Sequence, residues 1–308
     1  MPSSEASVVL APGPWTHRDI AANGARFHAA ETGSGPLVLL LHGFPEFWWA
    51  WRHQLPLLAR AGYRAVAVDL RGYGGSDKPP RGYDPFTLSA DVAALVRVLG
   101  EREAVVVGHG WGGFLGWTTA VLHPQVVSHL AVLSMPHPRR LRGALLADQR
   151  QVAHSVHVLG FQTPWVPERR LVADDGALVE RLIRRWSATP GWPDPATTAR
   201  YRQAIRIPGV AHSALEYHRW ALRSIPRPDG MRFARRMRTP VRVPVLHVHG
   251  EHDGSLLPRS AAGSDRYVSG PYRWRLLRGV GHFPHEECPE VLGGELLSWL
   301  ASNPKAAG

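Results

Sequence analysis

Residues 104–113, Ala-Val-Val-Val-Gly-His-Gly-Trp-Gly-Gly, decide the fold of this chain. The apolar run 104–107 predicts a buried strand, and the small residues after it predict a sharp turn into a helix. Strand and helix backbones approach closely at such a turn, so the positions beside its centre must be small, as Gly108 and Gly112 are. The pattern is that of a nucleophile elbow, which presents one side chain at the end of a strand. Its centre is Gly110, which has no side chain and therefore no nucleophile.

Short apolar runs and helical spacing alternate through the first 137 residues. The continuous runs predict parallel strands that are covered on both faces, at 37–41, 65–68, 104–107 and 130–133. Helical spacing lies between them, at 48–61, 87–99 and 113–122, with Thr87 or Ser89 expected to cap the second helix and Gly100 to end it. Asn23-Gly24 predicts a hairpin between strands 15–22 and 25–31, at an antiparallel edge of the sheet.

The strand pattern stops after residue 136 and returns near residue 243. Between them, prolines punctuate segments of helical spacing such as 177–186 and 197–205. A strand at 243–248, a helix at 260–268, a strand at 272–277 and a helix at 290–301 follow. The sequence therefore predicts an α/β protein with a mostly parallel eight-stranded sheet flanked by helices. Its core domain would comprise 1–136 and 239–308, and a helical cap domain would be inserted at 137–238.

Composition limits the function classes. The 308 residues are 44% hydrophobic and 20% charged, which is apolar enough for a large core and too weakly charged for a disordered chain. The net charge of +11 is concentrated, because residues 139–242 hold 20 Arg and 8 acidic residues. These cations are scattered and accompany no nucleic-acid-binding motif, so we expect no nucleic-acid partner. A solvated Arg-rich surface, or a preference for anionic or aromatic small molecules, is the alternative.

Cysteine use and apolar run lengths predict the compartment. Cys288 is the only cysteine, which excludes an intrachain disulfide and a multi-cysteine metal site, and we expect it to serve packing. No ligand cluster of workable spacing and no phosphate-binding loop occurs, so we expect no metal and no cofactor. Runs such as 37–41 are too short to span a bilayer, and residues 1–11 lack a secretory pattern. We expect a cytoplasmic monomer or homodimer with no membrane partner.

Polar residues after later strands complete a catalytic constellation around the elbow. Asp253 and His282 each follow a predicted strand. The order of elbow, acid and histidine along the chain is that of an α/β hydrolase. The backbone N–H groups of Phe44, after the third strand, and of Trp111, after the elbow centre, are expected to form an oxyanion hole.

Three motifs resemble those of epoxide hydrolases, in the α/β-hydrolase superfamily: His42-Gly43-Phe44-Pro45-Glu46, Asp69-Leu70-Arg71-Gly72-Tyr73-Gly74-Gly75-Ser76 and Gly108-His109-x-Trp111-Gly112-Gly113. The resemblance covers about residues 15–303 and implies the α/β-hydrolase fold. In that family an Asp at the elbow centre opens the epoxide to give an alkyl-enzyme ester, and a His-Asp pair activates the water that hydrolyses it. Haloalkane dehalogenases are a second possibility, but they usually place a halide-binding Asn where this chain has Phe44.

The chain departs from the family pattern at three positions. Gly110 replaces the nucleophilic Asp. Of two cap tyrosines that bind the epoxide oxygen, Gly160 stands where the first precedes a Phe-Gln-x-Pro segment, and His218 stands where the second precedes an Arg. The resemblance implies that the substrate contacts are His218, Tyr217, Phe161, Trp165 and Pro45.

The residues leave three functions open. The first is an epoxide-hydrolase-like enzyme for a hydrophobic small-molecule epoxide or related electrophile, in which His282 and Asp253 activate water directly. The second is a non-hydrolytic proton-transfer enzyme that catalyses elimination, isomerisation or cyclisation. The third is a ligand-binding pseudoenzyme. Gly110 also has a structural explanation, since glycine relieves about 1–3 kcal/mol of backbone strain at an elbow. His109 is expected to pack rather than to catalyse.

Overall fold

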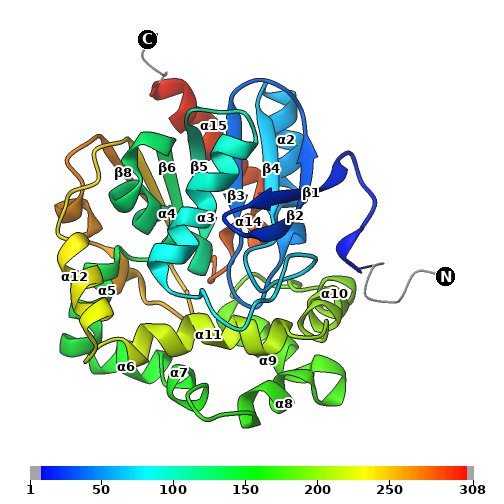
Figure 1. Cartoon of the computed structure of the whole chain (residues 1–308), viewed down its shortest axis with the longest axis vertical. Coiled ribbons are helices and arrows are strands. Elements are labelled where there is room, and N and C mark those ends of the chain that lie inside the picture. The colour runs from blue at the N-terminus through cyan, green and yellow to red at the C-terminus, as the bar shows by residue number, and fades with distance from the viewer. Residues whose placement is uncertain (1–7, 304–308) are drawn as a thin grey trace.

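The computed structural model describes residues 8–303, which are built around one eight-stranded sheet (Figure 1). The strand order is β1-β2-β4-β3-β5-β6-β7-β8. The strands are β1 (Thr16–Ala22), β2 (Ala25–Thr32), β3 (Leu37–Leu41), β4 (Arg64–Val68), β5 (Ala104–His109), β6 (Val127–Leu133), β7 (Val245–Gly250) and β8 (Tyr272–Leu277). β2 pairs antiparallel with β1 and β4, and every other neighbouring pair is parallel. The predicted mostly parallel sheet is therefore confirmed, and each predicted strand overlaps an observed one.

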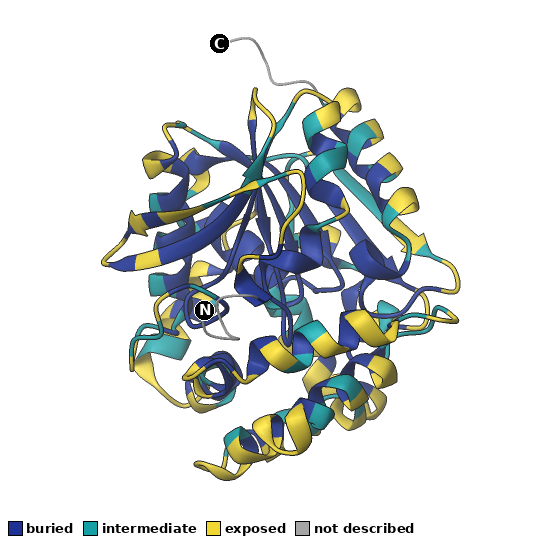
Figure 2. Ribbon diagram, turned by 90° about the vertical axis from the view of Figure 1, so that its right-hand side faces the viewer, coloured by how far each residue is buried: buried dark blue, intermediate teal, exposed yellow. Residues whose placement is uncertain are grey.

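Helices bury the central strands on both faces. Every residue of β3 and β5 is buried, as the unbroken apolar runs predicted (Figure 2). Helix α4 contacts β3, β5 and β6 and packs with α3, while α15 packs with α2. These helices are α2 (Gln54–Arg60), α3 (Pro85–Val98), α4 (Trp111–Leu122) and α15 (Pro289–Ser302). The edge hairpin turns at Asn23 and Gly24, which both have positive φ, and this confirms the Asn-Gly prediction.

Helix boundaries differ from the predictions for local reasons. The N-cap of α3 is Asp84, whose carboxylate accepts the N–H groups of Phe86 and Thr87, so the expectation of Thr87 or Ser89 as the cap was wrong. The predicted helix 48–61 is divided into a 3₁₀ turn, Trp48–Trp51, and α2. Pro56 has no N–H to continue helical bonding, so it lies in the first turn of a new helix.

The predicted helix 260–268 is also divided. It consists of α13 (Pro258–Ala261) and a 3₁₀ turn, Ser264–Tyr267. Gly263 lies between them with a φ of 86°, a left-handed conformation that ends a helix.

Residues 137–238 lie between β6 and β7, and all the regular elements within this fully described segment are helical. Figure 1 shows its helices grouped below the sheet, and Figure 2 shows that their outer sides carry many exposed residues. They are α5 (Pro138–Ala147), α6 (Gln149–His154), α7 (His157–Gly160), α8 (Val166–Val172), α9 (Ala177–Trp186), α10 (Pro195–Ile205), α11 (Val210–Arg223) and α12 (Pro228–Arg236). We propose that this segment is a cap domain and call it the cap. Within residues 8–303, no helix has the length and apolarity needed to cross a bilayer.

Candidate active site

The elbow predicted from the sequence joins β5 to α4. A Cβ at Gly108 would collide with the carbonyl oxygen of Gly112, and one at Gly112 would collide with the carbonyl oxygen of Leu41. Both positions therefore require glycine, because the backbones of β3, β5 and α4 approach one another here. Gly110 lies at the centre of the turn with φ 50° and ψ −118°.

Gly110 faces His282. A Cβ built at position 110 would lie 3.5 Å from the Cα of Gly43 and 3.8 Å from Nε2 of His282, which are ordinary van der Waals separations. The space at position 110 therefore accepts a side chain, but the left-handed φ makes any non-glycine residue cost about 1–3 kcal/mol. The first atom of such a side chain would stand beside the imidazole.

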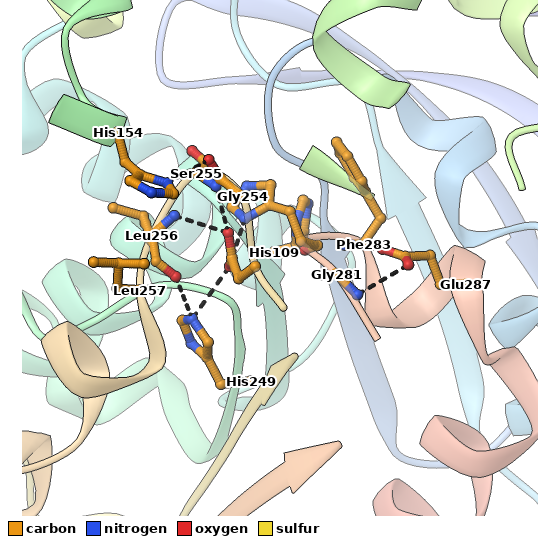
Figure 3. A network of polar contacts seen from close by, with 12 residues as sticks. His109, His154, His249, Gly254, Ser255, Leu256, Leu257, Gly281, Phe283 and Glu287 are labelled. Atoms are coloured by element: carbon orange, nitrogen blue, oxygen red, sulfur yellow. Dashed lines mark hydrogen bonds and ion pairs between the residues drawn. The ribbon is translucent and has the colours of Figure 1, made fainter. Parts of the chain in front are cut away.

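His282 is oriented by Asp253. Nδ1 of His282 lies 2.8 Å from Oδ2 of Asp253, and both side chains are buried. The other carboxylate oxygen of Asp253 accepts the N–H groups of Ser255 and Leu256, each at 2.8 Å (Figure 3). Burial alone would raise the pKa of Asp253, but the charge of His282 and hydrogen bonds from His249 and His282 lower it overall. Asp253 is therefore a carboxylate that holds the proton of His282 on Nδ1 and leaves Nε2 to face position 110.

The loop that carries His282 is held by Glu287, a residue that the sequence analysis missed. The His282 N–H donates to the carbonyl of Trp186 in the cap, at 2.8 Å. The buried Glu287 carboxylate accepts hydrogen bonds at 2.9–3.0 Å from the N–H groups of Gly281, Phe283, Ala188 and Thr189 and from the Thr189 hydroxyl. Figure 3 shows the contact of Glu287 with Gly281. One carboxylate thus ties both neighbours of His282 to the cap.

His109 is fully buried at the elbow and also forms hydrogen bonds that the sequence did not predict. Its Nε2 lies 2.8 Å from the backbone oxygen of His282, and its Nδ1 lies 2.7 Å from Oε2 of Glu46. The other oxygen of Glu46 lies 2.8 Å from Nε2 of His285. Burial lowers the pKa of His109, but the charge and hydrogen bond of Glu46 outweigh it, and the pKa is raised overall. A protonated His109 donates one hydrogen bond to Glu46 and one to the backbone carbonyl of His282. Each nitrogen–oxygen contact of this network then contains one proton.

The same three side chains are close enough to hold a metal ion, with ligand atoms within 4.8 Å of one another. The 2.7–2.8 Å separations between nitrogen and oxygen are hydrogen-bond distances. Two ligands of a tetrahedral Zn²⁺, each about 2.0–2.1 Å from the metal, would stand farther apart. Glu46, His109 and His285 therefore form a proton-sharing network.

The two N–H groups expected to form the oxyanion hole have no acceptor within residues 8–303. The N–H of Phe44 and that of Trp111 donate to no protein group there, although Phe44 is buried. The N–H groups of the residues next to them do have acceptors: that of Gly43 donates to Glu46, and that of Gly112 donates to the carbonyl of His42. Phe44 directly follows Gly43 and Trp111 directly follows Gly110, so the two open donors belong to the two segments that meet at this point.

Aromatic rings of the cap cover this group of residues. The ring of Phe44 lies 5.8 Å from that of Phe161 and 5.0 Å from that of His218. Trp186 lies 5.7 Å from the ring of His282 and 5.1 Å from that of His157. Neither Trp186 nor His157 is among the substrate contacts predicted from the sequence. A surface hollow of about 550 Å³ lies elsewhere, between α6 and α13, and reaches none of these rings.

His218 has no free N–H. Its Nδ1 lies 3.1 Å from the carbonyl of Ala214, which only accepts, so Nδ1 carries the proton. Its Nε2 lies 3.0 Å from Nε1 of Trp111, which only donates, so Nε2 accepts. Burial, with a smaller contribution from His157, lowers the pKa of His218 to about 3. His218 is therefore neutral, and both of its nitrogens are engaged.

The other three predicted substrate contacts, Tyr217, Trp165 and Pro45, lie in different surroundings. The hydroxyl of Tyr217 donates to the carbonyl of Arg71 at 2.8 Å, so it is directed to the core and not to His282. Trp165 is 70% exposed, and its ring contacts no other ring within residues 8–303. Pro45 is buried directly after Phe44. The structure thus brings Phe161 and His218 to the site and leaves Trp165 at the surface. Cys288 lies apart, with its thiol directed to the carbonyl of Pro284.

Comparisons with known proteins identify the family of this chain. Residues 36–289 match the family model of the alpha/beta hydrolase fold. The chain is 35% identical to epoxide hydrolase 3 of Xenopus tropicalis, over 90% of this chain and 75% of that protein. It is 31% identical to epoxide hydrolase A of Mycobacterium tuberculosis, over 92% and 97%. The solved structure of an epoxide hydrolase from an endophytic Streptomyces has a TM-score of 0.82 and 30% identity, and covers 94% of this chain and 96% of its own.

Proposed function

The chain belongs to the α/β-hydrolase fold family and is related to its epoxide hydrolases, and from this premise we propose that it hydrolyses a hydrophobic small-molecule electrophile, an epoxide or a related compound. The water that attacks the substrate is activated by His282 and Asp253. No covalent ester with the protein forms, because Gly110 supplies no nucleophile.

This proposal rests on the orientation of the His282 imidazole ring. Its Nε2 lies 3.8 Å from the Cβ position of residue 110, while Asp253 holds its Nδ1 at 2.8 Å. A water molecule between Gly110 and His282 can give a proton to Nε2 as its oxygen attacks an electrophilic carbon. The carboxylate of Asp253 stabilises the imidazolium that results. General-base catalysis of this kind contributes about 10²–10⁴-fold.

The surrounding rings favour an apolar substrate. Phe44, Phe161 and Trp186 are each buried and lie within a ring contact of His218 or His282. We propose that these rings bind the substrate body, after the cap rings separate to admit it. The same rings exclude bulk water from the imidazole, so the attacking water is the one that His282 holds.

The test is turnover of styrene oxide in oxygen-18 water, followed by mass spectrometry of the protein and the products. We expect the label in the diol and an unchanged protein mass, with the activity lost in His282→Gln. A protein-bound alkyl ester, or undiminished activity in His282→Gln, would contradict the mechanism. A product without solvent oxygen indicates the proton-transfer alternative. Binding that survives in His282→Gln, without turnover in either protein, indicates the pseudoenzyme.

A further inference from the structure

Exposed apolar side chains are concentrated at one end of the cap. Eight of the fourteen exposed large hydrophobic residues within residues 8–303 lie in 145–172, which is less than a tenth of that range. Single exposed apolar residues are normal on a protein surface, but a group of them marks an interaction site. Figure 1 shows α6, α7 and α8, which belong to this segment, along the edge of the molecule away from the sheet. This edge is therefore a candidate interaction surface.

Five of these residues lie together and form a surface that we call the apolar patch: Leu145, Leu146, Val152, Val156 and Leu159. Leu145, Leu146 and Val152 line one surface hollow of about 240 Å³. Val152, Val156 and Leu159 have the spacing i, i+4, i+7, and backbone hydrogen bonds continue from α6 into α7. These three side chains therefore share one side of the helical segment. Leu146 is 82% exposed, so the patch faces solvent.

The other side of α6 is bound to the core. The buried side chain of Gln151 donates to the carbonyl of Ser255 at 3.1 Å and accepts the N–H of Leu257 at 2.9 Å. Nδ1 of His154 lies 2.8 Å from the carbonyl of Gly254. These bonds fix the rotation of α6 about its axis, so Val152 cannot turn inward without breaking them.

Unpaired positive charge accompanies the apolar patch. The only acids of residues 139–172 are engaged, because Asp148 lies 2.7 Å from Arg259 and Glu168 lies 2.7 Å from Arg219. Four exposed arginines of this segment have no carboxylate partner within residues 8–303: Arg142, Arg150, Arg169 and Arg170. Arg142 precedes Leu145 and Leu146 by three and four residues on α5, which places them on the same side of that helix.

Apolar side chains combined with arginines fit the surface of an anionic bilayer. The apolar side chains enter the boundary between headgroups and acyl chains, and the guanidinium groups attract anionic lipid. Trp165 is exposed and lies four residues before Arg169, and tryptophan is enriched at membrane–water interfaces. A second copy of this chain fits less well, because two such surfaces would bring unpaired arginines together.

From these observations we propose that the apolar patch and the four arginines dock this protein on the surface of a bilayer that contains anionic phospholipid. Docking of this kind needs no spanning helix. The proposal replaces the expectation of no membrane partner, which rested on the length of the apolar runs. It does not depend on the proposed function, because binding to a membrane is measured without turnover. A hydrophobic substrate would dissolve in the same bilayer.

The experiment measures cosedimentation of the full chain with vesicles of phosphatidylcholine alone, or of phosphatidylcholine with about 30% phosphatidylglycerol. We expect binding to the anionic vesicles to be at least about tenfold tighter than to the neutral ones. Salt at about 0.5 M should weaken this binding, because it screens exposed charges. Equal binding to the two kinds of vesicle, or binding to neither, overturns the proposal.

Two pairs of variants locate the docking surface. Val152→Ser/Val156→Ser is matched by Val98→Ser/Val291→Ser on α3 and α15, because all four valines are between 45% and 55% exposed. Arg169→Gln/Arg170→Gln is matched by Arg60→Gln/Arg97→Gln, which removes the same charge from exposed positions of α2 and α3. We expect each cap variant, and neither control, to weaken binding to the anionic vesicles by at least about tenfold, with Tm measured for all four.

The outcomes separate a membrane from a protein partner. Equal loss of binding in folded cap and control variants overturns the proposed location. A dimer of the wild type in analytical ultracentrifugation that dissociates in Val152→Ser/Val156→Ser, without binding to vesicles, makes the apolar patch an interface between copies and overturns the proposal.

Discussion

His109 and His282 are joined by a hydrogen bond of 2.8 Å from the Nε2 of the first to the backbone carbonyl of the second. His109 directly precedes Gly110 on the chain, so this bond fixes the end of β5 against the loop that carries the base. Two contacts therefore fix the distance between the Gly110 backbone and Nε2 of His282. His109, which is covalently bonded to Gly110, holds the His282 backbone, and the carboxylate of Asp253 holds the His282 ring.

Replacing Gly110 with Asp should restore a nucleophile but only part of the activity. We expect Gly110→Asp to lose about 1–3 kcal/mol of stability from its φ of 50°, and to form an alkyl ester with styrene oxide that is visible by intact-protein mass spectrometry. Ring opening should stay slow, because both nitrogens of His218 are engaged and the hydroxyl of Tyr217 donates to Arg71, so neither side chain donates to the departing oxygen. Adding His218→Tyr should accelerate diol formation by about 10-fold or more. Full activity in Gly110→Asp alone would show that ring opening needs no hydrogen-bond donor at position 218.

Asp253 should be needed for the tautomer of His282 and not merely for folding. Asp253→Asn keeps the shape of the side chain but removes the charge that holds the proton on Nδ1, and we expect turnover to fall by about 10⁴-fold. The matched control is Asp265→Asn, which makes the same chemical change at an exposed position. A folded Asp253→Asn protein with more than a tenth of the wild-type rate would refute this role.

The pair of His109 and Glu46 predicts a specific dependence of stability on pH. The folded pKa of His109 is raised, so its contribution to stability is complete below its unfolded value of about 6.5 and is lost as pH rises through the folded pKa. We expect the difference in free energy of unfolding between wild type and His109→Gln to shrink as pH rises above 7. Urea unfolding from pH 6 to pH 9 measures it, and a constant difference would disprove the charged pair.

Glu287 should position the base. Glu287→Gln replaces one acceptor oxygen with a donor that faces several N–H groups, so we expect a loss of about 1–3 kcal/mol in stability. We also expect a fall in kcat with KM nearly unchanged, because the substrate rings are untouched. Glu290→Gln, exposed three residues later, is the control for the charge. If Glu287→Gln loses stability but keeps kcat, its role is structural only.

The sheet and the elbow could be predicted because their signals are local. The unbroken apolar run of β5 and the glycines at 108 and 112 lie within ten residues, and the backbone contact they permit is the one found. Asp253 and His282 could be predicted because each follows a strand, and parallel strands bring their carboxyl ends to one edge.

The contacts that hold the base could not be predicted. Glu287 contacts Thr189, which lies 98 residues earlier in the sequence, and neither periodicity nor motif spacing indicates a contact over that distance. Tyr217 and His218 are adjacent on α11, but adjacent side chains of a helix point about 100° apart. The sequence places both near the site, and only packing decides that His218 contacts Phe44 while Tyr217 contacts Arg71.

The carboxylate of Glu287 holds residues 188–189 of the cap and the flanks of His282 at the same time. A cap that swings away to admit a molecule must break the first set of bonds and so loosen the second. We therefore expect substrate entry and proton transfer to occur in separate steps, with His282 aligned for proton transfer only after the cap has closed over the substrate. In the open protein, His282 would not be aligned to take a proton from solvent water.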